Sequence, residues 1–160
     1  MITIIRNYNT TDIKDSINYL LDKASKSEEV RQLAVQITYN KEDKIGAIYD
    51  FMKSSVSYIQ DPVSDGEIEL FVSPVKQVEN YNQGLRMAGD CDDMALLATA
   101  LYRSIGIKSN VVIIDSLGNG LDHAYCRAWS KELDDWIECD PTSQYPLGWS
   151  VPYHSKNVVE

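Results

Sequence analysis

The sequence has few cysteines, a minority of basic residues and no long apolar run. Three cysteines in 160 residues, an odd number without paired spacing, do not form a disulfide framework, so a reducing compartment is expected. Lys and Arg number 15 against 24 Asp and Glu, a net charge of −9, which argues against nucleic acid and anionic membrane surfaces as partners. No stretch has the length of a membrane span, and residues 1–6 lack the pattern of a signal peptide. The sequence predicts a cytoplasmic protein.

The length and composition are those of one globular domain. At 160 residues, 44% of them hydrophobic, the chain is long enough to bury a core. No internal repeat, low-complexity tract or linker divides it. We therefore expect a single domain over residues 1–160, with a helical N-terminal part at 1–40, a core at 41–143 and an extended tail at 144–160.

The segment 89–106 predicts a buried helix that begins with a cysteine. Asp90, after Gly89, is positioned as the helix N-cap, and Gly106 as the glycine that ends it. Apolar residues recur at helical spacing on one stripe, at Met94, Leu97, Leu101 and Ile105. Cys91 therefore lies in the first turn, where the helix dipole and free N–H groups stabilise a negative charge and lower the pKa of a thiol.

Two strand-like runs downstream predict a hairpin that carries a histidine and an aspartate. His123 opens the run 123–129, Asp140 lies near the end of the run 136–142, and the polar segment between them has the composition of a turn. Alternation places His123 and Asp140 so that the folded hairpin brings them side by side near its open end. A helix N-terminus docked there would complete a thiolate, imidazole and carboxylate line. The imidazole would take the thiol proton, and the carboxylate would orient the imidazole.

These pieces, in this order, resemble the transglutaminase-like superfamily, a branch of the papain-like cysteine enzymes. The resemblance covers about residues 41–143, and it rests on Gly89-Asp90-Cys91-Asp92-Asp93, the strand 111–114, His123-Ala124-Tyr125, Glu138-Cys139-Asp140-Pro141-Thr142 and the upstream segment 45–59. It implies an α+β papain-like fold, in which N-terminal helices pack on a small, mainly antiparallel sheet. It also implies roles for three residues: Cys91 as nucleophile, His123 as general base and acid, and Asp140 as the orienting carboxylate.

The group that would stabilise an oxyanion is less defined. The backbone N–H of Cys91 is one candidate, and side-chain candidates are Gln83, Gln60 and Tyr58. Residues 60–88 are rich in turn signals, and an irregular stretch just before a nucleophile is where a compact enzyme tends to hold its substrate.

The resemblance implies a cysteine enzyme that acts on amide bonds through an acyl-thioester. Water as acceptor makes it a peptidase or amidase, which is the reaction we expect, and an amine as acceptor makes it a protein cross-linking transglutaminase. The superfamily also includes members without catalysis, so a binding or assembly module on the same fold stays an alternative. We expect a protein or peptide substrate and no cofactor, and the acidic residues form no calcium loop.

A zinc site is the other chemistry to weigh for the cysteines and histidines. The spacings contain no Cys-x-x-Cys and no His-Glu-x-x-His pattern. Alternation also places Cys126 on the strand face opposite His123, and Cys139 opposite Asp140. We therefore expect no metal, and we expect Cys126 and Cys139 to be reduced core residues that can be cross-strand neighbours.

Negative charge around Cys91 opposes its ionisation. Asp90, Asp92 and Asp93 flank the thiol, and nearby carboxylates disfavour a thiolate. Carboxylates in a first turn also satisfy the helix N-terminus, so Asp92 and Asp93 need not point toward the sulfur. An imidazolium at His123 would favour the thiolate as an ion pair. The acidic surroundings predict a substrate that carries an amine or a basic side chain.

Overall fold

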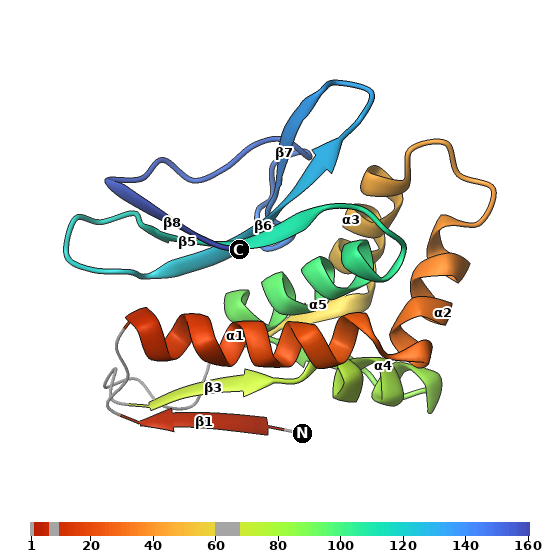
Figure 1. Cartoon of the computed structure of the whole chain (residues 1–160), viewed down its shortest axis with the longest axis horizontal. Coiled ribbons are helices and arrows are strands. Elements are labelled where there is room, and N and C mark those ends of the chain that lie inside the picture. Colours follow the sequence, from red (N-terminus) through yellow and green to blue (C-terminus); the bar gives the residue numbers. More distant parts are fainter. Residues whose placement is uncertain (1, 7–9, 60–67) are drawn as a thin grey trace.

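The computed structural model describes residues 2–6, 10–59 and 68–160 (Figure 1). The N-terminal half is mainly helical, and the C-terminal half is mainly strands. In chain order the elements are β1 (Ile2–Arg6), α1 (Thr10–Ser25), α2 (Glu28–Thr38), α3 (Lys44–Ser55), β2 (Val56–Tyr58), β3 (Ile68–Val72), α4 (Pro74–Asn82), β4 (Met87–Gly89), α5 (Cys91–Ser104), β5 (Ser109–Asp115), β6 (His123–Ser130), β7 (Asp135–Cys139) and β8 (Ser155–Val159).

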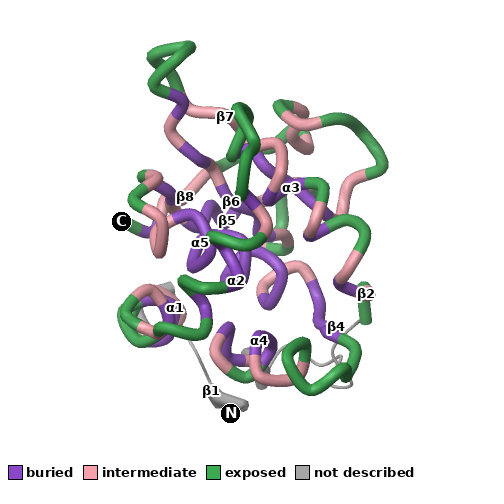
Figure 2. The backbone as a smooth tube through the Cα atoms, turned by 90° about the vertical axis from the view of Figure 1, so that its right-hand side faces the viewer, coloured by how far each residue is buried: buried purple, intermediate pink, exposed green. Residues whose placement is uncertain are grey.

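The helix α5 is the centre of the molecule. Every residue from Asp93 to Tyr102 is buried, because helices contact it on one side and the sheet covers it on the other. Figure 1 shows α5 between the sheet and α1, and in Figure 2, where buried backbone is purple, α5 and β5 lie in the interior. Gly106 follows α5 with a φ of 83°, as expected for a glycine that ends a helix. The predicted buried helix is confirmed.

The strands of the C-terminal half form an antiparallel sheet in the order β7-β6-β5-β8. The residues Val111–Ile114 of β5 are all buried, and β5 lies inside the sheet between β6 and β8, which confirms the strand expected at 111–114. The strand β8, in which Val158 pairs with Val112, comes from the segment 144–160, which was expected to be an extended tail. Helices packed on this sheet give the α+β, papain-like arrangement that the resemblance implied.

The two faces of this sheet have different surroundings. Cys126 lies directly opposite Cys139 in the register of β6 and β7, both are free thiols, and both belong to the core around α5. The predicted cross-strand pair is confirmed. The other face carries Tyr125 in a second, smaller apolar cluster with Val112, Ile114, Val151 and Val158. Cys126 and His123 thus belong to opposite faces, and no cluster of three or more metal-binding side chains occurs within the described ranges.

A short parallel pair, β2 and β4, leads the chain into α5. Tyr58 pairs with Gly89, and the Ile59 N–H donates to the Gly89 carbonyl oxygen at 2.8 Å. The buried side chain of Gln77 satisfies Ala88 of β4, since its Nε2 donates to Ala88 O at 2.6 Å and its Oε1 accepts from Ala88 N at 3.2 Å. The Gln77 side chain thus makes the hydrogen bonds that a second neighbouring strand would make to β4, and it fixes the backbone that leads to Cys91.

Candidate catalytic site

The N-terminus of α5 is held by two reciprocal hydrogen bonds. Asp90 Oδ1 accepts from the Asp93 N–H at 3.2 Å, and Asp93 Oδ2 accepts from the Asp90 N–H at 3.1 Å. The second Asp93 oxygen, Oδ1, accepts from the Val72 N–H at 2.7 Å. Both carboxylates are buried, and each satisfies backbone donors that would otherwise be unpaired. The predicted N-cap is confirmed, and two of the three aspartates beside Cys91 are engaged with the backbone.

Cys91 is the first residue of α5 and is partly exposed. Its Sγ lies 4.0 Å from Asp92 Oδ1, so the carboxylate of Asp92 is close to the sulfur. At this position the dipole of a helix of 14 residues favours a negative charge. The thiol therefore experiences two opposing effects, the favourable helix terminus and the unfavourable carboxylate of Asp92.

His123 and Asp140 form a short hydrogen bond, as the hairpin pattern predicted. His123 Nε2 lies 2.7 Å from Asp140 Oδ2, and the two side chains are 19% and 1% exposed. The other Asp140 oxygen, Oδ1, accepts from the Thr142 N–H at 3.1 Å and from Thr142 Oγ1 at 2.7 Å. The Tyr49 hydroxyl donates to the Asp140 carbonyl oxygen at 3.3 Å and to Tyr145 O at 2.8 Å. Both carboxylate oxygens of the buried Asp140 and its backbone carbonyl oxygen thus accept hydrogen bonds.

Thr142 and Tyr49 were not predicted as site residues. A signal for Thr142 was present, because a Thr two residues after an Asp is the spacing at which side chain and backbone bond to the Asp carboxylate in a turn. Tyr49 is separated from Asp140 by 91 positions, and no local pattern could have connected the two.

The pKa of His123 is raised by its carboxylate neighbours. Burial of the ring acts to lower it, and the hydrogen bond and charge of Asp140, followed by the charges of Asp122 and Asp92, more than offset this. Asp92 lies in the first turn of α5, so its effect on the ring links the cysteine helix to the start of β6. In Figure 1 the N-terminal end of α5 and the beginning of β6 lie at the same end of the molecule.

Most of the chain matches a model of a known family. The sequence model of the transglutaminase-like superfamily matches residues 30–141. The chain belongs to the transglutaminase-like superfamily. The match includes Cys91, His123 and Asp140, and membership of this superfamily supports a cysteine-based enzyme in general. No curated protein sequence matches the chain.

Two solved structures of similar fold are candidate proteases. A candidate cysteine protease from Cytophaga hutchinsonii has a TM-score of 0.58 and 22% identity, over 98% of this chain and 54% of its own. A candidate protease from Parabacteroides distasonis has a TM-score of 0.53 and 15% identity, over 83% of this chain and 26% of its own. The chain thus spans about half of the first neighbour and a quarter of the second, and the likeness concerns the fold.

The predicted oxyanion residues of this transglutaminase-like chain lie in three different places. Tyr58 pairs with Gly89, two residues before Cys91, and is 54% exposed. Gln83 is the exposed C-cap residue of α4, and its N–H donates to the carbonyls of Glu79 and Asn80. Gln60 lies outside the described residues. The roles of all three stay predictions, and Tyr58 is the one that β-sheet register places beside the cysteine turn.

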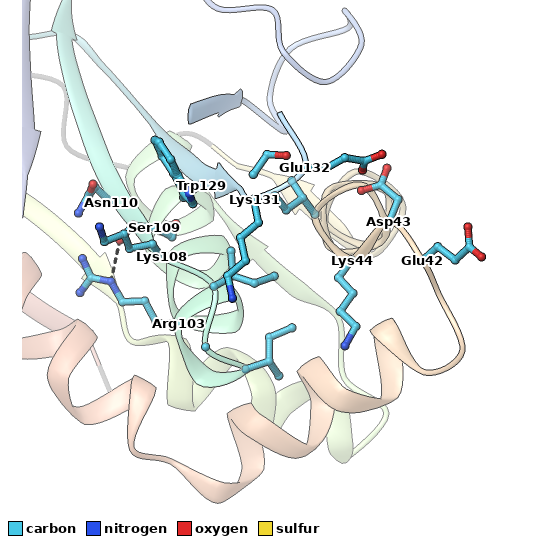
Figure 3. A pocket seen from close by; sticks show the side chains of 15 residues that line it. Glu42, Asp43, Lys44, Arg103, Lys108, Ser109, Asn110, Trp129, Lys131 and Glu132 are labelled. Carbon is cyan, nitrogen blue, oxygen red and sulfur yellow. Dashed lines mark hydrogen bonds between the residues drawn. The ribbon is translucent and has the colours of Figure 1, made fainter. Parts of the chain in front are cut away.

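An open cavity of about 1040 Å³ lies elsewhere, at the C-terminal end of α5 (Figure 3). Arg103, Lys131 and Lys44 contribute to its lining, and Arg103 Nε donates to Ser109 O at 2.8 Å. A helix of 14 residues is about 20 Å long at 1.5 Å per residue, so this cavity is remote from Cys91. Neither Cys91, His123 nor Asp140 lines it, and the candidate chemistry of this chain belongs at the opposite end of the helix.

None of the described helices is both long and apolar enough to cross a membrane.

Proposed function

We propose that this chain is a cysteine acyl-transfer enzyme that hydrolyses amide bonds in proteins or peptides. The observation that carries the proposal is the 2.7 Å bond between His123 Nε2 and the buried Asp140 carboxylate. Because Asp140 engages Nε2, the proton that the imidazole exchanges with the thiol is carried by Nδ1. Cys91 supplies that thiol from the first turn of α5.

The reaction follows from these positions. His123 Nδ1 takes the Cys91 proton, and the thiolate attacks the amide carbonyl carbon, while N–H groups at the N-terminus of α5 stabilise the oxyanion. The imidazolium then donates its proton to the leaving amine, which departs as the C–N bond breaks and leaves an acyl-thioester. A water molecule, deprotonated by His123, attacks the thioester carbon. The C–S bond breaks, the carboxylic acid leaves, and the Cys91 thiol is restored.

The exposure of the site favours water as the acceptor. Tyr58 is 54% exposed beside the cysteine turn, and Cys91 itself is partly exposed. A thioester that is open to solvent reacts with water unless a bound amine excludes it. We therefore place hydrolysis ahead of cross-linking.

Two carboxylates give the site an acidic rim. Asp92 contacts the sulfur, and the Asp122 carboxylate is held next to His123 by the Ser116 N–H and hydroxyl at 2.9 and 2.7 Å. Both charges act on the His123 ring. A positive charge on the substrate near the scissile bond would therefore be attracted, and we infer a preference for peptides with a lysine, an arginine or a free amine there.

The first test is the rate of Cys91 alkylation by iodoacetamide against pH, read by mass spectrometry on the native protein. We expect fast modification well below about pH 8.5, the ordinary thiol pKa, and loss of this advantage in His123→Ala. The matched control is His154→Ala, because His154 is exposed and is assigned no catalytic role. A Cys91 that reacts as slowly in the wild type as in His123→Ala would overturn the proposal in favour of a non-catalytic module.

The second test separates the two acceptors and the charge preference. Two matched peptides, one with Lys and one with Gln next to the scissile amide, are incubated with the protein, with and without a primary amine. We expect Lys peptides to be cleaved faster at low salt, with a ratio that falls as salt screens the charges. Amine adducts without cleavage would show transamidation instead, and equal rates for both peptides at all salt concentrations would contradict the acidic rim.

A further inference from the structure

On the sheet face that carries His123 and Asp140, neighbouring side chains of β6 and β7 are related to one another in the same way as His123 is to Asp140. In the register of β6 and β7, Arg127 lies opposite Glu138 and Cys126 opposite Cys139. One more step of this register places Tyr125 opposite Asp140. His123 therefore reaches Asp140 along a diagonal, and diagonal cross-strand neighbours lie within reach of aromatic and long side chains.

The same diagonal direction recurs twice along the two strands. The Arg127 guanidinium stacks on the Trp136 ring, with Cζ 3.9 Å from the ring centroid, although Glu138 is its direct neighbour. Between these two contacts lie Tyr125 and Glu138, which stand in the same diagonal relation. The candidate catalytic pair is thus the last of three parallel diagonal contacts, and Tyr125 is the residue next to it.

Tyr125 is packed against the imidazole and is itself anchored by burial. The rings of His123 and Tyr125 are 6.1 Å apart between centroids, inclined at 35°, within the range of aromatic contacts. Tyr125 is 1% exposed. One side of the His123 ring therefore faces a side chain that has no room to turn away.

The far end of Tyr125 has a partner of complementary chemistry. Tyr125 Oη and Glu138 Oε2 are both buried, and among the described residues neither has a hydrogen-bond partner at good geometry. One is a donor and the other an acceptor, and burial together with the Glu138 carboxylate raises the pKa of Tyr125, so the hydroxyl keeps its proton. Lys156 Nζ lies 3.3 Å from the other Glu138 oxygen, Oε1. Glu138 thus acts on the Tyr125 hydroxyl and is itself paired with Lys156 of β8.

We propose that Tyr125 is a positioning residue for His123, and that the Glu138 and Lys156 pair anchors the Tyr125 hydroxyl. The inference rests on the proposed function, in which His123 must present Nε2 to Asp140 and Nδ1 to Cys91 at the same time. A planar ring packed on the imidazole restricts rotation about the His123 side-chain bonds. Only one ring orientation then satisfies both partners, and positioning of this kind contributes to rate without contact with substrate.

The test is a titration of the histidine ring protons by NMR, together with the Cys91 alkylation rate. The chain has two histidines, so His154→Ala assigns both signals. We expect Tyr125→Leu to lower the His123 pKa toward its ordinary value of about 6.5 and to slow Cys91 alkylation at that pH by about tenfold or more. Tyr125→Phe keeps the ring and loses the anchor, and we expect intermediate values of both quantities.

Arg127→Leu is the matched control, because it removes another diagonal contact on the same face without touching His123. We expect it to change stability and to leave the His123 titration unchanged. If Tyr125→Leu lowers only the melting temperature, the proposal is overturned. If that variant does not fold, Tyr125→Phe decides, and a His123 titration identical to the wild type overturns the proposal. Failure of the wild type in the alkylation test would instead contradict the proposed function, whatever the Tyr125 variants show in the NMR titration.

Discussion

The carboxylate of Asp93 occupies the space beside Gly89 that any larger residue would need. A Cβ on Gly89 would lie 2.5 Å from Asp93 Cβ and 2.7 Å from Asp93 Oδ2. The same carboxylate accepts from the Asp90 and Val72 N–H groups. The turn that presents Cys91 therefore depends on the absence of a side chain two residues earlier.

Gly89→Ala should displace Asp93 and destabilise the protein. The change costs part of the helix cap, about 1 kcal/mol, and the desolvation of a freed N–H, about 1–3 kcal/mol. We expect a loss of roughly 2–4 kcal/mol in urea unfolding and slower Cys91 alkylation. The control is Gly84→Ala, where φ is 77° and no atom lies within 4 Å. It introduces backbone strain alone, and an equal effect on Cys91 would contradict the role of Asp93.

Asp140→Asn should remove most of the activity. The uncharged amide cannot stabilise an imidazolium and presents a donor where His123 Nε2 needs an acceptor, so we expect the peptide-cleavage kcat to fall by roughly 10³-fold or more. Thr142→Val is the matched variant, since it removes the 2.7 Å hydroxyl bond to Asp140 Oδ1 and keeps the N–H bond. We expect it to cost about 1 kcal/mol of stability and less than about tenfold in kcat. Similar losses in both variants would show that Asp140 acts through packing alone.

His123 should make stability depend on pH near neutrality. Its pKa is raised in the folded protein, so folding favours the protonated ring. This contribution is fully present below the unfolded pKa, about 6.5, and is lost as the pH rises through the folded pKa. We expect the free energy of unfolding to fall over that window in the wild type and not in His123→Gln. A wild-type stability that rises with pH across the same window would reverse the sign of the assigned interaction.

The three cysteines should separate into two classes. Cys126 and Cys139 are 0% and 1% exposed, and burial raises the pKa of Cys126, followed by the effect of Cys139. We expect iodoacetamide to modify them only in denaturant. Cys126→Ala should cost about 1–2 kcal/mol of stability and keep activity. Cys91→Ala should abolish activity and change stability by less than about 0.5 kcal/mol. Modification of Cys126 in the native protein at the rate of Cys91 would contradict this division.

Much of the site could be predicted because its parts are short, periodic and local. The helical stripe of α5, the N-cap at Asp90 and the two-residue alternation of the hairpin each depend on neighbours in the chain. Alternation was enough to predict that His123 and Asp140 could meet near the open end of the hairpin, and that Cys126 and Cys139 could be cross-strand neighbours in the core. Asp92 was different, since only the folded turn shows its carboxylate at 4.0 Å from the sulfur.

The remaining features depend on contacts between distant segments. The residues of β4 and β8 carry no alternating pattern. The strand β4 forms because β2 pairs with it, with Tyr58 opposite Gly89, and β8 forms because β5 pairs with it, with Val112 opposite Val158. The Tyr49 bond to Asp140 O spans 91 positions. Interactions of this kind are decided by which surfaces the core brings together.

By itself, the sequence determined the cysteine helix, the hairpin and the order of the three candidate catalytic residues, because helical and strand periodicities are properties of contiguous residues. The tertiary structure alone decided the register and diagonal direction of the strand contacts. A sheet twists as it packs on a helix, so this geometry belongs to the whole fold. The continued register of β6 and β7 would put Thr142 directly opposite His123, but the diagonal direction of the contacts makes Asp140 its partner. The same geometry places Tyr125 beside that pair.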